Sequence, residues 1–242
     1  MSAEFPIEAG YPFYGAATGI AIIDSGIPRP PGDVGNARSF DFPVRYQVVP
    51  GIGAADMSAP RSARVEDAFV AALEQLAADG VRLAGSSCGL LARYQPEVAK
   101  RSPIPVALSS LSQLPLVLQI LNPDQQVLVV TLTEGGVGAD HLDGAGVASQ
   151  QRGRVVVGDL AGAAHLRDAI SERVDSYDVD RARAEVAAGV GRWLPAGHQI
   201  GAMVLECTNL APFSDTLRAT FGIPVWDVLT LLTWLNGAVH AY

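Results

Sequence analysis

The two cysteines of this chain, Cys88 and Cys207, are its best candidates for chemistry, and they occupy matching places in the sequence. Each follows an aliphatic run typical of a buried β-strand, and each precedes a stretch with helical spacing. An Ile-Pro-Val sequence begins sixteen positions after each cysteine, at Ile104 and at Ile223. The shared spacing favours an internal duplication with one cysteine in each copy, and a chance likeness between strand-helix units is the alternative.

A thiol between the end of a parallel strand and the start of a helix lies among unpaired backbone N–H groups, which favour the thiolate. We therefore expect the pKa of each cysteine to be lowered toward neutral pH from an ordinary value of about 8.5. If Cys88 and Cys207 face each other across a cleft, one can remove a Cα proton while the other delivers a proton from the opposite side. Since a free cysteine near a strand is often inert core, two buried cysteines are the competing interpretation.

The rest of the chain alternates short aliphatic runs with helical patterns, which predicts an α/β fold with mainly parallel sheets. In such sheets ligands bind beyond the carboxyl ends of the strands, where both cysteines fall. The predicted strands cover residues 19–23, 81–84, 128–133 and 200–205. The predicted helices cover residues 62–78, 90–100, 111–121, 214–220 and 229–239.

Composition narrows the class of protein. The 242 residues are 49% hydrophobic and carry a net charge of -8, and the absence of a dense Lys/Arg patch argues against a nucleic-acid partner. Residues 1–14 lack the pattern of a secretory signal, and the apolar stretch 223–239 is interrupted by Asp227 and Asn236, so we expect a soluble cytoplasmic protein without a membrane partner. Two cysteines without CxxC spacing, and scattered histidines, predict neither a disulfide framework nor a metal site.

Several motifs together resemble the aspartate/glutamate racemase superfamily. They are Gly-Ser-Ser-Cys-Gly at 85–89, Leu-Glu-Cys-Thr-Asn at 205–209 and Gly-Ile-Pro-Val-Trp-Asp at 222–227, and the Pro-rich run 27–36 is similar to a less characterised branch. The resemblance implies two pseudosymmetric Rossmann-like lobes with the active site in a cleft between them, no cofactor, and a thiol pair that interconverts enantiomers. It also implies that the final strand and helix return to the first lobe, so that lobe 1 comprises 1–113 and 215–242 and lobe 2 comprises 114–214.

The resemblance assigns roles to individual residues. Cys88 and Cys207 match the acid/base pair, and Thr208 matches a residue that helps to hold the substrate carboxylate. Asp24 and Ser25 stand at the Asp-Ser-Gly turn that glutamate racemases use for the substrate amino group and for catalytic support, although a plain turn after a strand is the alternative.

The chain also departs from the glutamate racemase pattern. Gly89 and Leu90 follow the first cysteine where Asn-Thr is usual, and Asn209 stands in place of a histidine. Ser86 and Ser87 offer hydroxyls that could compensate, although helix N-caps are the simpler role for them. We place Ser87, Gly89 and Asn209 among the predicted substrate-binding residues, and Arg29 is a further candidate for binding a carboxylate.

These observations predict an isomerase of amino acid metabolism: a PLP-independent racemase or epimerase of a small aspartate- or glutamate-like amino acid, acting by two-base proton transfer. The expected partner is a small carboxylate substrate, and a homodimer is the candidate assembly. The alternatives are a hydantoin racemase, a maleate-type cis/trans isomerase, and a noncatalytic ligand-binding protein that lost the activity.

Overall fold

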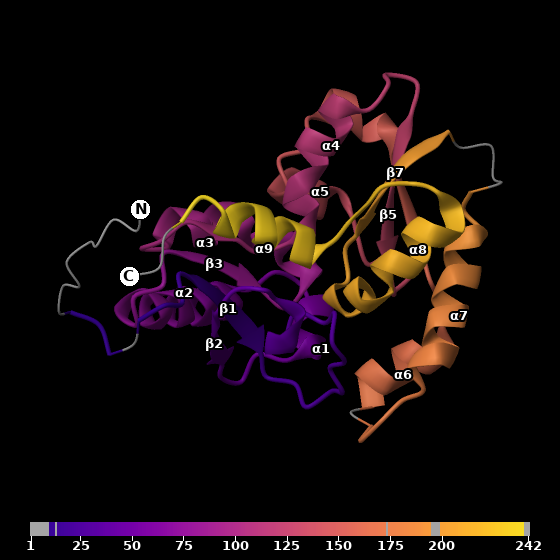
Figure 1. The fold of residues 1–242 in the computed structure, drawn as a ribbon. Helices are drawn as coiled ribbons and strands as arrows, with labels where there is room; N and C mark the ends of the chain where they lie inside the picture. The colour runs from indigo at the N-terminus through magenta and orange to yellow at the C-terminus, as the bar shows by residue number, and fades with distance from the viewer. Residues whose placement is uncertain (1–9, 13, 173, 195–198, 240–242) are drawn as a thin grey trace, which may run out of the picture.

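The structure, a computed structural model, describes residues 10–12, 14–172, 174–194 and 199–239. Most of residues 1–14, on which the signal-peptide argument rests, therefore lie outside the described residues. The described chain forms two lobes, each built on a four-stranded parallel sheet (Figure 1). The strand orders are β2-β1-β3-β4 and β6-β5-β7-β8, which is the same topology twice, so the prediction of an α/β protein with two similar parallel-sheet lobes is confirmed.

The strands are short, and the central strands β1, β3, β5 and β7 are mostly buried, as expected for parallel sheets covered by helices. The edge strands β2, β4 and β6 are mostly half-buried. Those of the first sheet are β1 Thr18–Ile23, β2 Val44–Val49, β3 Leu83–Ser86 and β4 Val106–Ala107. Those of the second sheet are β5 Gln126–Thr131, β6 Val155–Asp159, β7 Ile200–Leu205 and β8 Val225–Trp226.

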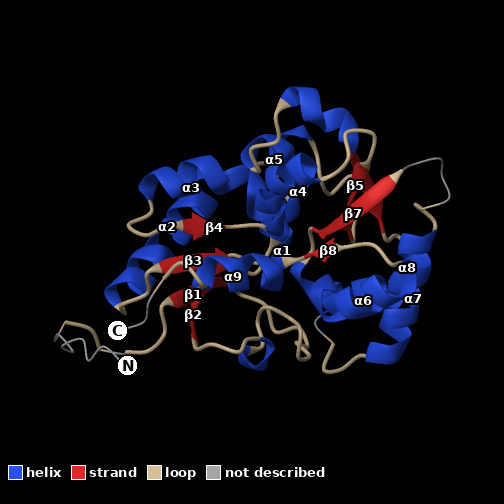
Figure 2. Ribbon diagram, turned by 45° about the horizontal axis from the view of Figure 1, so that its top comes forward, coloured by secondary structure: helices blue, strands red, loops and turns tan. Residues whose placement is uncertain are grey.

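Helices cover both sheets, and several connections are short 3₁₀ turns (Figure 2). The α-helices are α1 Ala54–Ser58, α2 Ala63–Ala78, α3 Gln95–Arg101, α4 Leu114–Ile120, α5 Ala139–Gly144, α6 Ala164–Glu172, α7 Val179–Gly191, α8 Ser214–Phe221 and α9 Val228–Asn236. The 3₁₀ helices are η1 Ala37–Ser39, η2 Gly89–Tyr94, η3 Ser110–Gln113, η4 Ser149–Arg154 and η5 Thr208–Phe213. No helix in the described part of the chain has the length and apolar character needed to cross a membrane.

Helix α2 shows how the apolar pattern builds the core. Val65, Phe69, Leu73 and Leu76 recur at helical spacing, and all four are buried in the core of the first lobe. The helix ends before Gly80, whose positive φ of 89° lets the chain turn back into β3. The predicted helix over 62–78 is confirmed.

The segment after Cys88 differs from the predicted α-helix over 90–100. The chain first forms the 3₁₀ helix η2 and only then the α-helix α3, which has Pro96 in its first turn. A proline has no N–H to donate and its ring clashes with the carbonyl four residues earlier, so one α-helix cannot run through this point. The result is a tight turn that begins at the cysteine. Cys207 begins the corresponding turn, η5, ahead of α8.

The last strand and the last helix belong to different lobes. Strand β8 pairs with β7, with Val225 opposite Met203, so the expectation that the final strand returns to the first lobe is wrong. An Ile-Pro-Val run pairs with the cysteine strand of its own copy, as β4 does with β3. Helix α9 crosses to the first lobe and lies beside β3 (Figures 1 and 2), where Leu232 packs so closely on Gly85 that a Cβ there would lie 2.6 Å from Leu232 Cδ2.

Candidate active site

The two cysteines lie where the lobes meet. Each follows the strand that is third in its sheet's order and begins a 3₁₀ helix, Cys88 at η2 and Cys207 at η5. Both side chains are partly exposed, and each borders the hydrophobic core of its own lobe. The ionisation of Cys88 raises the pKa of Cys207, so the two sulfurs are near enough to interact. The duplication has therefore brought one thiol from each copy to a shared junction.

The turns that carry the cysteines are packed directly on each other. A Cβ built on Gly89 would lie 1.9 Å from the backbone oxygen of Glu206 and 2.5 Å from its Oε1, which only a glycine can allow. Thr208 Oγ1 donates a hydrogen bond of 2.7 Å to the backbone oxygen of Ser87. Gly89 and Thr208 thus join the first-lobe turn to the second-lobe turn.

The expected lowering of the thiol pKa values is wrong. Burial and, to a lesser extent, the nearby Glu206 carboxylate raise the pKa of Cys88 to about 12, although backbone N–H groups of Leu90 and Leu91 act in the opposite direction. Burial likewise raises the pKa of Cys207 well above its ordinary value. The N–H groups at the turns are present as predicted, but desolvation of a thiolate beside a carboxylate outweighs them.

Glu206 is a buried carboxyl group beside both thiols. Its position directly before Cys207 left two interpretations open, a side chain that tunes the thiol or one that points away into the structure, and Glu206 was not among the predicted site residues. Its side chain is 3% exposed, and Oε2 accepts a hydrogen bond of 2.8 Å from Thr131 Oγ1. Burial raises the pKa of Glu206 to about 7, and the Thr131 hydroxyl partly offsets this increase. Glu206 can therefore exchange a proton near neutral pH. The sequence runs 21–26 and 128–133 each contain the end of the strand that opens one copy of the repeat, and Thr131 occupies the fourth position of its run as Asp24 does in the other. This correspondence was the one sequence signal for Thr131.

The Pro-rich loop of residues 28–36 contributes a second carboxylate, Asp33, which was not among the predicted site residues. Arg29 Nη1 pairs with Asp33 Oδ1 at 2.8 Å, and Arg29 Nη2 donates to Ser25 Oγ at 3.0 Å. Asn209 Nδ2 donates to Asp33 Oδ2 at 2.8 Å, and the Cys207 thiol donates to Asn209 Oδ1 at 3.7 Å. Arg29 therefore holds Asp33 in this structure, whereas the sequence analysis proposed it for a substrate carboxylate.

The remaining predicted residues differ in position. Ser87 is 4% exposed, and its hydroxyl accepts a hydrogen bond of 2.9 Å from the backbone N–H of Ile23, so its side chain links the first cysteine turn to β1. Ser25 is connected to the site through Arg29. Asp24 is exposed at the end of β1, with its backbone N–H bonded to the Ile52 oxygen. The structure thus brings together the predicted residues on the two cysteine turns, with Asp24 at the exposed margin.

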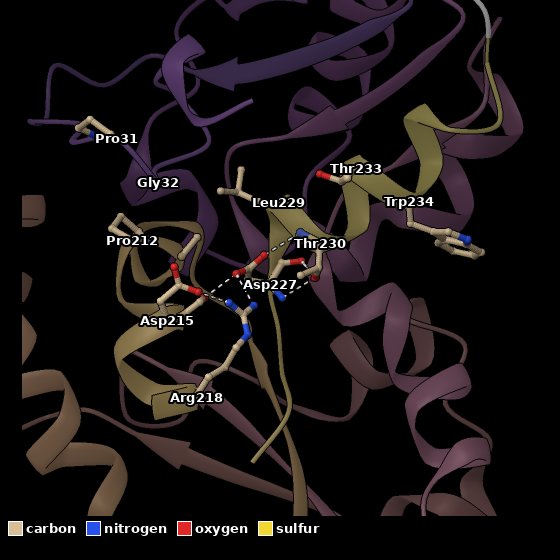
Figure 3. A pocket seen from close by; sticks show the side chains of 12 residues that line it. Pro31, Gly32, Pro212, Asp215, Arg218, Asp227, Leu229, Thr230, Thr233 and Trp234 are labelled. Atoms are coloured by element: carbon tan, nitrogen blue, oxygen red, sulfur yellow. Dashed lines mark hydrogen bonds and ion pairs between the residues drawn. The ribbon is translucent and has the colours of Figure 1, made fainter. Parts of the chain in front are cut away.

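A separate groove of about 700 Å³ lies where the Pro-rich loop, η5, α8 and α9 come together (Figure 3). Arg218 and Asp215, which both line the groove, form an ion pair on α8, and Arg218 also approaches Asp227. Neither cysteine lines this groove. The candidate site is therefore the junction of the two cysteine turns. In the described residues no three Cys, His, Asp or Glu side chains gather as metal ligands.

Comparison with solved structures gives the fold. Glutamate racemase from Francisella tularensis superposes with a TM-score of 0.55 at 13% identity, over 93% of this chain and 80% of that chain. Aspartate racemase from Picrophilus torridus has a TM-score of 0.55 at 15% identity, over 92% and 95% of the two chains. The fold is that of the aspartate/glutamate racemases. It is not restricted to racemases, because arylmalonate decarboxylase superposes with a TM-score of 0.54 at 15% identity, over 93% and 95%.

The sequence relatives have a different activity. A dimethylsulfoniopropionate lyase of Durusdinium sp. clade D is 29% identical over 221 residues, which are 88% of this chain and 72% of that protein. Dimethylsulfoniopropionate lyases 5 and 7 of Emiliania huxleyi are 28% and 27% identical over 92% and 88% of this chain, which spans 45% and 64% of their lengths. No protein-family model matches the chain. The predicted racemase activity is therefore contradicted: the relatives are enzymes, but they are lyases.

Proposed function

We propose that this chain is a lyase that cleaves dimethylsulfoniopropionate or a closely similar sulfonium carboxylate by β-elimination. The observation that carries the proposal is the junction of two thiols and a buried carboxyl group, Cys88, Cys207 and Glu206, in a chain whose sequence relatives along most of its length are lyases of this substrate. A racemase and this lyase share their first chemical step, because both remove a proton from the carbon next to a carboxylate.

The proposed reaction needs one base and no cofactor. A thiolate removes a proton from the carbon next to the carboxylate, and the electron pair of that C–H bond forms a carbon-carbon double bond. The bond between the next carbon and sulfur breaks, and its electron pair leaves with the sulfur. The products are acrylate and neutral dimethyl sulfide, and the thiol carries the proton until solvent removes it. Because the leaving group is neutral, no acid has to protonate it.

The electrostatics of the site suit the sulfonium group of the substrate. Burial and the Glu206 carboxylate hold the pKa of Cys88 at about 12, so a positive charge is needed to favour the thiolate. A sulfonium ion roughly 5 Å from the sulfur, at an effective dielectric constant of about 20, would stabilise the thiolate by about 3 kcal/mol. That corresponds to roughly two pKa units of the thiol. The substrate carboxylate opposes this effect, so the sulfonium group has to lie nearer to the thiol than the carboxylate does. An analogue of the same shape without the sulfonium charge would not favour the thiolate.

The experiment is to incubate the purified chain with dimethylsulfoniopropionate and to measure dimethyl sulfide by gas chromatography and acrylate by NMR. We expect equal amounts of the two products, and a loss of about 100-fold or more in Cys88→Ser, within the range usually contributed by general base catalysis. Ser149→Ala, at an exposed position of η4, is the control substitution and should retain activity.

An analogue without the sulfonium charge tests the electrostatic argument. 3-(Methylthio)propionate has the same carboxylate and carbon chain but a neutral thioether in place of the sulfonium group, so we expect it to be neither cleaved nor an effective competitor. Dimethyl sulfide release no greater than that of the Cys88→Ser/Cys207→Ser double variant would refute the proposed activity. Competition by this analogue as strong as that of the substrate would refute the role of the sulfonium charge.

A further inference from the structure

A hydrogen-bonded chain connects Arg29, Asp33 and Asn209 to the thiol of Cys207. Asp33 Oδ1 accepts from Arg29 Nη1 at 2.8 Å and from the backbone N–H of Gly35 at 2.7 Å. Asp33 Oδ2 accepts from Asn209 Nδ2 at 2.8 Å. These hydrogen bonds cross from the Pro-rich loop of the first lobe to the cysteine turn of the second lobe. It is therefore one of the contacts that set the environment of Cys207.

The Asp33 carboxylate determines which way the Asn209 amide points. A carboxylate paired with an arginine offers only acceptors, so the amide group of Asn209 that faces it must be the NH₂. The amide oxygen is then left facing the sulfur of Cys207, at 3.7 Å. An acceptor next to a sulfur stabilises the protonated thiol and disfavours the thiolate.

The hydrogen-bond partners of Cys88 differ from those of Cys207, although the Glu206 carboxylate raises the pKa of both thiols. Backbone N–H groups of Leu90 and Leu91, at the start of η2, donate toward the Cys88 sulfur and favour its thiolate. Cys207 also receives one backbone N–H, from Asn209, but its side-chain neighbour is the amide oxygen. Two thiols at equivalent places in a duplicated fold are therefore held in unequal environments.

From this arrangement we infer that Asp33, held by Arg29, is a positioning residue that keeps Cys207 in the thiol form through Asn209, and that Cys88 is the base. The assignment of the base rests on the proposed lyase function, since elimination of a neutral sulfide needs only one base. A symmetric pair in which either thiol ionises would suit proton transfer from both faces. An elimination gains from having the second thiol neutral, because a second anion would oppose ionisation of the first.

Close packing keeps Asp33 in place. Asp33 is 1% exposed, and a Cβ on Gly35 would lie 2.3 Å from Arg29 Cδ, so the arginine passes directly over the glycine. Gly32 has a φ of +98°, and a Cβ there would lie 2.8 Å from the Cα of Pro212 in η5. Gly32 therefore lets the loop touch the second lobe, and Gly35 leaves room for the Arg29 side chain that pairs with Asp33.

Alkylation of single-cysteine variants tests the inference without any substrate. Cys207→Ala leaves Cys88 as the only thiol, and Cys88→Ala leaves Cys207. The rate of modification by iodoacetamide is followed by mass spectrometry as a function of pH, because only the thiolate reacts. We expect Cys88 to react about tenfold faster than Cys207 at a given pH, which corresponds to roughly one unit of pKa difference.

The Cys88→Ala protein then receives one further change. Asp33→Asn allows the Asn209 amide to turn its NH₂ toward the sulfur and also removes a negative charge that acts on Cys207. Alkylation of Cys207 should become at least about fivefold faster, with its pH midpoint shifted downward. Glu206, which also acts on Cys207, is unchanged in this comparison. Asp41→Asn removes the same charge from an exposed position and should leave the rate unchanged.

Asn209→Ala, made in the same Cys88→Ala protein, is the second variant. It removes the oxygen that accepts from the Cys207 thiol and leaves the Arg29–Asp33 ion pair in place. It therefore tests the inference even if Asp33→Asn does not fold. It should also accelerate alkylation of Cys207. Cys207 reacting faster than Cys88, or an Asn209→Ala rate within about twofold of the parent, would overturn the inference. Unequal thiols together with no dimethyl sulfide release would refute only the proposed lyase function.

Discussion

Replacement of Gly89 by alanine tests whether the contact between the two cysteine turns holds the site together. The new Cβ would lie 1.9 Å from the backbone oxygen of Glu206, where ordinary van der Waals contact is 3.4–4 Å. The obstacle is backbone, so no rotation of a flexible side chain can relieve the clash. The turn of Cys88 and the turn of Cys207 must therefore move apart.

The size of the effect follows from the packing. Forcing an extra carbon into a well-packed interior costs about 1–3 kcal/mol. For a chain of this length each kcal/mol lowers Tm by about 2–4 °C, so Gly89→Ala should lower Tm by roughly 4–8 °C for a cost of about 2 kcal/mol. Activity should fall further than stability, because a displacement of about 1 Å in a catalytic group can reduce the rate by about 100-fold.

The assays are thermal unfolding followed by circular dichroism and dimethyl sulfide release at a temperature where both proteins are folded. Gly153→Ala is the matched control, because a Cβ there meets nothing within 4 Å and the residue is exposed in η4. It should leave both measurements unchanged. A Gly89→Ala protein with the Tm and the rate of the parent would show that the two turns are not packed as described.

Three further predictions concern the carboxyl group of the site and the packing of α9. The folded-state pKa of Glu206 is about 7, above its ordinary value of 4.5, so protonated Glu206 contributes fully to stability below pH 4.5 and this contribution is lost as the pH rises through 7. Glu206→Gln should abolish this loss of stability. Parallel curves of Tm against pH for the two proteins would contradict the assignment. Thr131→Val removes the hydrogen bond to Glu206 and should raise the pKa of Glu206 further. The free energy of unfolding, measured in urea, should fall by about 1–2 kcal/mol, and the loss should be largest above pH 7, where the Glu206 carboxylate is charged. Leu232→Ala should lower the free energy of unfolding by about 2–5 kcal/mol in the same assay, because Leu232 is fully buried against Gly85. Trp234→Ala in the same helix is the control: the Trp234 side chain is 64% exposed, so its removal should cost less than about 1 kcal/mol.

The comparison of the two lobes shows how much of the architecture was predictable. Periodicity predicted the helix at α2 and the central strands, and the equal spacing from Cys88 to Ile104 and from Cys207 to Ile223 indicated the duplication that the two identical sheet orders bear out. The partner of the final strand was mispredicted. Val225 pairs with the second sheet, and the helix that follows it packs on the first sheet. The strand pairs within the copy of the repeat to which it belongs. The apolar helix packs on whichever sheet face it can reach.

The sequence by itself determined that two thiols stand at the ends of equivalent strands, since strand order and apolar spacing are local properties of the chain. Tertiary structure alone decided the state of those thiols. The pKa of Cys88 depends on its burial and on the Glu206 carboxylate of the other lobe, and the pKa of Glu206 depends on its burial and on the Thr131 hydroxyl. Asp33 reaches Asn209 only because a proline-rich loop folds across the junction. Desolvation and charge-charge interactions depend on distance in space and not on separation along the chain, which is why the two cysteine motifs could not predict these pKa values.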